Sequence, residues 1–311
     1  MVMKVIHYHL DEVLEIENQL AMAIGFFDGV HQGHLTLINE VLNYAKKNHT
    51  QSALMTFYPS PLVTLGKVKE EHYLTSPLDR QEILEKLGVD YLIIVDFSKE
   101  VSQLLPEVFF EKFITSLPLK YLVCGFDYHF GLKGQGNVKM LQTLAKDRFE
   151  VYVQDEVVED DKKISSTRIR LLLDEGNIEK VNHLLSRVYR IQGTVIKGRQ
   201  IGRTIGFPTA NIDYGHYFIP KNGVYGVKLE VNGKMYIGMC NIGYNPTFDK
   251  LDHPSLEVNV FDFDEDIYHQ NAKVYFYCFI RDEVKFSSPN DLVKQLLTCL
   301  LYTSPSPRDC S

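Results

Sequence analysis

Two histidines three residues apart mark the most informative segment, Gly25-Phe26-Phe27-Asp28-Gly29-Val30-His31-Gln32-Gly33-His34. The segment lies between an apolar run typical of a buried strand and an amphipathic stretch typical of a helix. Its backbone N–H groups and the positive end of the helix would therefore bind an anion. His31 and His34 would share one face of the first turn, where imidazoles can donate hydrogen bonds to phosphate oxygens and stabilise a leaving pyrophosphate. The alternative is a pair of surface histidines in a turn.

Hydroxyl groups open a second predicted helix, in Ile164-Ser165-Ser166-Thr167-Arg168-Ile169-Arg170. Ser165, Ser166 and Thr167 stand at capping positions, and Arg168 lies in the first turn. Hydroxyls and backbone N–H groups can hold a triphosphate, and an arginine fork reaches its β- and γ-oxygens. Alone, the three hydroxyls would indicate only a helix cap. Together with the histidine segment they predict a nucleotidyltransferase that binds ATP between two helix ends.

A glycine-rich segment in the second half, Gly202-Arg203-Thr204-Ile205-Gly206-Phe207-Pro208-Thr209-Ala210-Asn211, is the next candidate for phosphate binding. Its glycines allow a loop to wrap closely on phosphates, and Pro208 restricts the backbone. Thr209 and Asn211 share one side of an extended chain and offer a hydroxyl and an amide oxygen to Mg²⁺. The spacing is not that of a Walker-type loop. A simple turn is the alternative.

Glu257 is the candidate base for a phosphoryl transfer to an alcohol, a reaction that needs an acceptor to orient the hydroxyl. It alternates with apolar residues in Ser255-Leu256-Glu257-Val258-Asn259-Val260, so it would point away from Leu256 and Val258. The alternative is that Glu257 lies on a solvent-exposed strand face and has no catalytic role.

Short apolar runs alternate with amphipathic stretches in the first half, as in a parallel sheet wound with helices. Such a sheet binds ligands at the carboxyl ends of its strands, where the strand order reverses. The expected strands are Ala21–Phe26, Ser52–Phe57, Tyr91–Asp96, Tyr121–Gly125 and Phe149–Gln154; the expected helices are Leu35–Lys47, Asp79–Leu87, Pro106–Leu117 and Val138–Arg148.

The second half is predicted to be a small antiparallel β-barrel closed by a helix near Asn290–Leu300. Asn232-Gly233 is a strong signal for a two-residue hairpin. The expected strands are Val188–Lys197, Val224–Val231, Lys234–Cys240, Leu256–Phe261 and Lys273–Ile280. A helical segment, Thr167–Ser186, would carry the chain between domains at 1–186 and 187–300, and 301–311 is expected to be a disordered or cloning-derived tail.

Composition is consistent with a two-domain globular protein of the cytosol. The chain has 311 residues with 45% hydrophobic and 23% charged residues. Its net charge of −7 argues against a nucleic-acid partner, and it lacks an apolar run long enough to cross a membrane or a recognisable signal peptide. Five scattered cysteines predict reduced thiols and no structural zinc. The expected partners are small molecules, and the expected state is a monomer or transient oligomer.

These motifs resemble those of the bacterial bifunctional riboflavin kinase/FAD synthetases, from about residue 15 to about 297. The resemblance implies that the first half is a Rossmann-like nucleotidyltransferase domain that adenylylates FMN to FAD and that the barrel phosphorylates riboflavin to FMN, with ATP and Mg²⁺. It implies nucleotide contacts from Gly25, Phe27, Asp28, Gly33, Asp127, Ser165, Ser166, Thr167, Gly202, Arg203 and Gly206; catalytic roles for His31, His34, Arg168 and Glu257; flavin contacts from Phe130, Tyr244 and Arg281; and Mg²⁺ ligands in Thr209 and Asn211.

One position departs from the family pattern. Ser60 stands between Pro59 and Pro61, where the family has histidine, and the lost imidazole predicts a weakened phosphate or flavin contact. Two alternatives stay open from the sequence: a monofunctional FAD synthetase whose barrel only binds flavin, and a flavin-binding regulator without catalysis.

Overall fold

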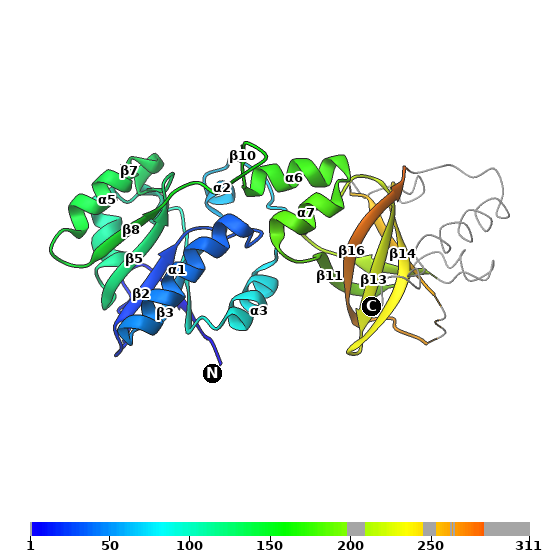
Figure 1. The fold of residues 1–311 in the computed structure, drawn as a ribbon, viewed down its shortest axis with the longest axis horizontal. Helices are drawn as coiled ribbons and strands as arrows, with labels where there is room; N and C mark the ends of the chain where they lie inside the picture. The colour runs from blue at the N-terminus through cyan, green and yellow to red at the C-terminus, as the bar shows by residue number, and fades with distance from the viewer. Residues whose placement is uncertain (1, 198–208, 245–252, 262, 264, 283–311) are drawn as a thin grey trace. The chain divides into compact units, whose positions relative to one another are not determined.

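The computed structural model describes residues 2–197, 209–244, 253–261, 263 and 265–282. The chain divides into two compact units, Met1–Arg168 and Ile169–Ser311 (Figure 1). The division lies at the start of the helical segment, whereas the domain boundary predicted at residue 186 lies after it; that boundary stays a prediction about where the two activities divide. None of the helices in the described ranges is long and apolar enough to cross a membrane.

Six parallel strands form the sheet of the first unit in the order β1-β4-β3-β2-β5-β8, which confirms the predicted parallel architecture. Each strand expected there is present, and one edge strand, β1, was not predicted, because its mixed sequence KVIHY lacks a clear apolar run. The strands are β1 (Lys4–Tyr8), β2 (Leu20–Ile24), β3 (Gln51–Tyr58), β4 (Tyr91–Asp96), β5 (Leu119–Gly125) and β8 (Glu150–Gln154).

Helices cover both faces of this sheet and give it two apolar cores. One core contains Ile38 and Val41 of α1 (Gln32–Asn48) and Leu84 of α3 (Pro77–Leu87). The other contains aromatic residues of α4 (Pro106–Phe109) and of the π-helical turn η2 (Phe110–Ile114), together with α5 (Val138–Ala145). The smaller elements are α2 (Pro61–Thr64), η1 (Val101–Gln103), β6 (His129–Phe130), η3 (Leu132–Gly134), β7 (Gly136–Asn137), β9 (Val158–Glu159) and β10 (Lys162–Lys163).

The strand order reverses beside β2. From β2 the chain continues to β3 and β4 on one side, whereas β5 and β8 lie on the other side. The loops that follow β2 and β5 therefore adjoin at one end of the sheet, which is where such folds bind ligands.

The second unit contains a closed antiparallel barrel in the order β11-β12-β15-β14-β13-β16. The predicted hairpin is confirmed, because Asn232 and Gly233 both have positive φ (53° and 72°) between β13 and β14. One strand, β12, was not predicted as such. The strands are β11 (Tyr189–Ile196), β12 (Thr209–Asp213), β13 (Gly223–Val231), β14 (Lys234–Gly243), β15 (Ser255–Val260) and β16 (Asn271–Arg281).

The predicted helical segment Thr167–Ser186 is two helices, α6 (Ser166–Glu175) and α7 (Ile178–Leu185). Gly176 has φ 79°, which ends α6, and the side chain of Asn177 caps α7 by accepting from the N–H of Lys180. Asn182 of α7 donates to the carbonyl of Phe276 at 2.9 Å and so joins this helix to the barrel. The helix predicted near 290–300 and the tail 301–311 lie outside the described residues.

Candidate functional site

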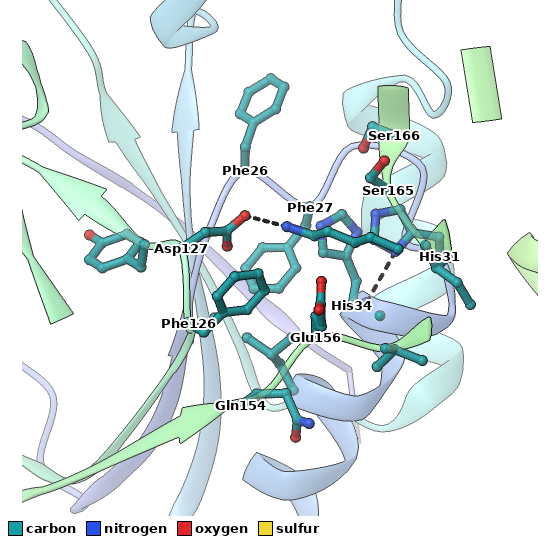
Figure 2. A pocket seen from close by; sticks show the side chains of 18 of the residues that line it. Phe26, Phe27, His31, His34, Phe126, Asp127, Gln154, Glu156, Ser165 and Ser166 are labelled. Atoms are coloured by element: carbon teal, nitrogen blue, oxygen red, sulfur yellow. Dashed lines mark hydrogen bonds and ion pairs between the residues drawn. The ribbon is translucent and has the colours of Figure 1, made fainter. Parts of the chain in front are cut away.

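A cavity of about 370 Å³ lies where the loops after β2, β5 and β8 meet the segment ahead of α6 (Figure 2). Its volume lies within the range of small-molecule sites. The sequence predicted most of its polar lining from separate motifs, and the structure brings those motifs together. The predicted site residues that line it are Gly25, Phe27, His31, Gly33, His34, Asp127, Ser165, Ser166 and Thr167.

His31 and His34 are stacked at this cavity, as the helical spacing predicts (Figure 2). Their ring centroids lie 3.7 Å apart with an interplanar angle of 14°. His31 is the N-cap of α1, and its Nδ1 accepts a hydrogen bond from the N–H of His34 at 3.3 Å. A neutral His31 that accepts at Nδ1 carries its proton on Nε2, so Nε2 can donate to an anion.

Gly33 makes room for the His31 ring. A Cβ at this position would lie 3.2 Å from atoms of the His31 ring and 3.5 Å from the carbonyl oxygen of Ile164. A side chain at this position would press on the His31 ring and shift it by a few tenths of an ångström, whereas it would only touch the Ile164 carbonyl. The glycine therefore leaves the His31 ring free to keep its place beside the cavity.

The serines ahead of α6 have separate tasks. Ser165 accepts a hydrogen bond from the N–H of Arg168 at 3.2 Å, which confirms the predicted cap. Ser166 donates to the carbonyl oxygen of Asp28 at 2.7 Å and ties α6 to the histidine turn. Both residues also line the cavity, so the start of α6 has a fixed position at its border.

Arg168 does not border the cavity. Its Nη1 donates to the carbonyl oxygens of Glu159 and Lys162, each at 2.9 Å. Its Nη2 lies 3.7 Å from a carboxylate oxygen of Asp160. The guanidinium therefore holds the β9–β10 hairpin next to the segment that opens α6, and its predicted catalytic role stays a prediction.

Asp28 is buried and lies outside the set of described residues that line the cavity. Its Oδ1 accepts from the backbone N–H groups of Leu74 at 3.0 Å and Thr75 at 3.2 Å. The carboxylate thus holds the backbone ahead of α3. This arrangement gives Asp28 a structural task beside the site, and its predicted nucleotide contact stays a prediction.

Lys163 is a candidate site residue that the motif analysis missed. It is the one lysine or arginine among the described residues that line the cavity. Its ammonium group forms an ion pair with Asp127 and lies 4.5 Å from the ring centroid of Phe126. Asp155 and Glu156 also line the cavity, so Lys163 places a positive charge among carboxylates. Its position before the Ser165–Thr167 hydroxyls was the available signal.

Tyr128 is a second missed residue. Its hydroxyl is buried and has no hydrogen-bond partner among the described residues, and burial raises its pKa well above the usual value. The residue lines the cavity, and its ring stacks on Phe130 with centroids 5.8 Å apart. Phe130 itself is buried in the sheet core and lies outside the cavity lining, so its predicted flavin contact stays a prediction.

In the barrel, Asn211 of β12 pairs directly with Glu257 of β15. Residues opposite each other in antiparallel strands project from the same face, so the amide and the carboxylate are neighbours. Thr209 lies two residues along β12 and shares that face. Asn241 of β14 pairs with Glu257 from the other side. The barrel therefore brings the predicted metal ligands and the predicted base onto one patch of its surface.

The other predicted barrel residues are spread more widely. Tyr244 is 58% exposed just after β14, and Arg281 ends β16, where its Nη1 donates to the carbonyl oxygen of Asp282. Gly202, Arg203 and Gly206 lie outside the described residues.

Ser60 occupies the position at which the family pattern has histidine. It is buried, and its Oγ caps α2 by accepting from the N–H of Leu62 at 3.2 Å. A hydrogen bond from Ser60 also lowers the pKa of Glu71, against a larger rise caused by burial of that carboxyl. The serine therefore has a local structural role.

Comparison with known protein families gives two matches that follow one another along the chain. The family model described as FAD synthetase matches residues 13–168, and the model described as riboflavin kinase matches residues 185–298. Curated relatives carry both activities in their names. A bifunctional riboflavin kinase/FMN adenylyltransferase of Listeria monocytogenes is 43% identical over 94% of this chain and 95% of its own length. The Bacillus subtilis protein of the same name is 40% identical over 94% of this chain and 95% of its own length.

A solved structure is similar over nearly the whole length of the chain. It is described as a macrolide-efflux protein from Streptococcus pneumoniae and is 33% identical. It covers 97% of this chain and 99% of its own, with a TM-score of 0.88.

Proposed function

Because the chain belongs to the family of bifunctional riboflavin kinase/FMN adenylyltransferases, we propose that it makes FAD from riboflavin in two ATP-dependent steps. The barrel phosphorylates riboflavin to FMN, and the first unit transfers the adenylyl group of a second ATP to FMN. The observation that carries the proposal is the convergence of the histidine turn and the hydroxyl-rich helix start on one cavity in the unit that the FAD synthetase model matches.

Adenylyl transfer takes place at that cavity. A phosphate oxygen of FMN attacks the α-phosphorus of ATP, a new P–O bond forms, and the bond between the α- and β-phosphates breaks to release pyrophosphate. His31 donates from Nε2 to the phosphates, with His34 stacked against it. Such donors, fixed before the substrate arrives, stabilise the charge that develops on the leaving group. Ser165, Ser166 and Thr167 border the triphosphate, and Lys163 offsets the nearby carboxylates.

Positioning dominates this reaction, because direct attack of one phosphate on another needs no protein nucleophile. Arg168 has two possible roles in this reaction. It exchanges its hydrogen bonds to the carbonyl oxygens of Glu159 and Lys162 for bonds to the triphosphate, or it keeps them and holds the β9–β10 hairpin at the border of the site. Asp127 pairs with Lys163 and is the predicted nucleotide contact on the β5 side. Gly25 lines the same cavity and lets the nucleotide approach the backbone.

Riboflavin phosphorylation takes place at the barrel patch. The oxygen of the ribityl 5′-hydroxyl attacks the γ-phosphorus of ATP, and ADP leaves. Glu257 accepts the proton of that hydroxyl. A hydroxyl, an amide oxygen and a carboxylate on one face suit Mg²⁺, which prefers oxygen ligands. Thr209 and Asn211 would hold the ion, which when bound neutralises charge on the β- and γ-phosphates. Gly202, Arg203 and Gly206 would bind ATP, and Tyr244 and Arg281 the flavin.

The partners of both sites are ATP, riboflavin and FMN. The proposal includes action in the cytosol, without a nucleic-acid or membrane partner, as a monomer or transient oligomer.

A single time course tests the two activities. Purified protein is supplied with riboflavin, ATP and Mg²⁺, and the three flavins are separated chromatographically. We expect FMN to rise first and FAD to follow. If riboflavin gives no FMN while a parallel reaction with FMN in its place gives FAD, the barrel does not phosphorylate riboflavin. Flavin binding without either product would show a protein that has lost catalysis.

A further inference from the structure

The turn between β2 and α1 has a backbone conformation that its residues do not favour. Phe27 has φ 53° and Val30 has φ 38°. A β-branched or bulky side chain rarely adopts positive φ, because its Cβ then crowds the backbone, so both residues are strained. This conformation persists only where the surrounding structure holds it in place. The turn leads directly into His31, so whatever holds it also sets the position of the imidazoles.

Thr75 and Asp28 hold the turn by a reciprocal pair of hydrogen bonds. The carboxylate of Asp28 accepts from the backbone N–H of Thr75 at 3.2 Å, and the Thr75 Oγ1 accepts from the backbone N–H of Gly29 at 2.9 Å. Both side chains are buried, with exposed fractions of 1% for Asp28 and 4% for Thr75. A buried N–H that loses its acceptor is destabilised more than an exposed one. Removal of either side-chain acceptor of the pair is therefore expected to disturb the turn.

Two further contacts restrict the same turn. Arg80 on α3 donates from Nη1 to the carbonyl oxygen of Phe26 at 2.9 Å and to Thr56 Oγ1 at 2.9 Å. Ser166 donates to the carbonyl oxygen of Asp28 at 2.7 Å. Of these groups, Ser166 borders the cavity, whereas Thr75, Asp28 and Arg80 lie outside the described residues that line it. Thr75 therefore acts on the site through the backbone of the turn.

We propose that Thr75 is a positioning residue for adenylyl transfer, an inference that rests on the function proposed above. Its hydroxyl fixes Gly29, which holds the strained turn so that His31 and His34 face the reacting phosphates. Loss of the hydroxyl leaves the Gly29 N–H without this acceptor and lets the turn relax. A displacement of about 1 Å at a catalytic group can cost on the order of 100-fold in rate. Loss of the Thr75 hydroxyl is therefore expected to slow the chemical step.

The test is Thr75→Val, which keeps the size and branching of the side chain and removes the acceptor. We expect kcat for FAD formation from FMN and ATP to fall about 10- to 100-fold, with KM for ATP within about twofold of wild type. Riboflavin phosphorylation by the same preparation is expected to stay within about twofold. Thr75→Ser restores the hydroxyl and should recover most of the rate. Asp28→Asn, which weakens the other half of the pair, should lower kcat in the same direction.

Ser52→Ala is the matched control. Ser52 is also buried, and its hydroxyl bonds to the Asp90 carboxylate at 2.7 Å near the start of β3, away from the carboxyl ends of the strands. We expect it to cost stability without lowering kcat. Equal rates in Thr75→Val and Ser52→Ala would overturn the inference, as would a rise in KM with kcat unchanged. If Thr75→Val does not fold, a normal kcat in Asp28→Asn would also overturn it. Wild-type protein that forms no FAD would instead contradict the proposed function.

Discussion

The imidazole of His31 stacks on that of His34, and its Nδ1 accepts the backbone N–H of the same residue. The two contacts keep the His31 ring in one orientation at the border of the cavity. The N–H bond also selects the tautomer of a neutral His31 that can donate from Nε2. His31 therefore both caps α1 through Nδ1 and offers Nε2 as a hydrogen-bond donor to a phosphate.

His31→Ala should separate the two activities. We expect the rate of FAD formation to fall about 100- to 1,000-fold, because a fixed donor to the leaving group is lost. Riboflavin phosphorylation should be unchanged, since the other proposed site lies in the barrel. Both rates are measured on one preparation by chromatography of the flavins. An unchanged rate of FAD formation would remove His31 from the proposed mechanism.

Glu257→Gln should give the opposite result. The amide keeps the size of the side chain but does not accept a proton, so we expect FMN formation to fall about 100- to 10,000-fold. FAD formation from supplied FMN should continue at the wild-type rate. Glu230→Gln on β13, whose carboxylate bonds to Tyr275, is a control for loss of a barrel carboxylate. A Glu257→Gln variant that phosphorylates riboflavin normally would contradict the assignment of the base.

Lys163→Ala should weaken ATP binding in the first unit. The triphosphate enters a cavity lined by Asp127, Asp155 and Glu156, and Lys163 is the cation there that offsets them. Loss of a charged hydrogen bond predicts a rise in KM for ATP of about tenfold or more in FAD formation. Lys162→Ala removes the neighbouring lysine, which lies outside the cavity lining, and should leave KM unchanged. Equal KM values in the two variants would contradict the prediction.

Tyr128→Phe should stabilise the ligand-free protein. The Tyr128 hydroxyl is buried without a partner in the described part of the chain, and removing it relieves about 1–3 kcal/mol of desolvation. Tyr8→Phe is the matched control, because the Tyr8 hydroxyl donates to the carbonyl oxygen of Lys112 at 2.8 Å and its loss should destabilise. Thermal unfolding without ligand distinguishes the two variants. A lower midpoint for Tyr128→Phe would show that the hydroxyl has a partner.

Cys124 should resist alkylation in the folded protein. Burial raises the pKa of its thiol to about 12, so the reactive thiolate is nearly absent between pH 7 and 9 and grows only as the pH approaches 12. Cys278 is partly exposed and serves as the internal comparison. Peptide mass spectrometry after iodoacetamide treatment should find Cys278 modified before Cys124. Rapid labelling of Cys124 at pH 8 would show that this end of β5 opens readily.

Local spacing was enough to predict much of the fold. The apolar runs that became β3, β4 and β5 and the Asn232-Gly233 hairpin are set by residues close together in the sequence. The apolar pattern does not predict the break at Gly176-Asn177, because it continues through these residues, whereas the left-handed backbone at Gly176 ends α6 and Asn177 caps α7. The strand β12 was not predicted because its first three residues belong to the glycine-rich segment that was interpreted as a phosphate-binding loop.

The sequence by itself determined which side chains share a face. His31 and His34 stack because the side chain of an N-cap lies over the third residue of its helix, and Thr209 and Asn211 share a side because strand residues alternate. Only the tertiary structure decided which distant groups become partners. Asp28 bonds to Thr75 across 47 positions, and Lys163 pairs with Asp127 across 36. Such pairs depend on which loops adjoin at the end of the sheet and on competition among acceptors, which the spacing of residues does not encode.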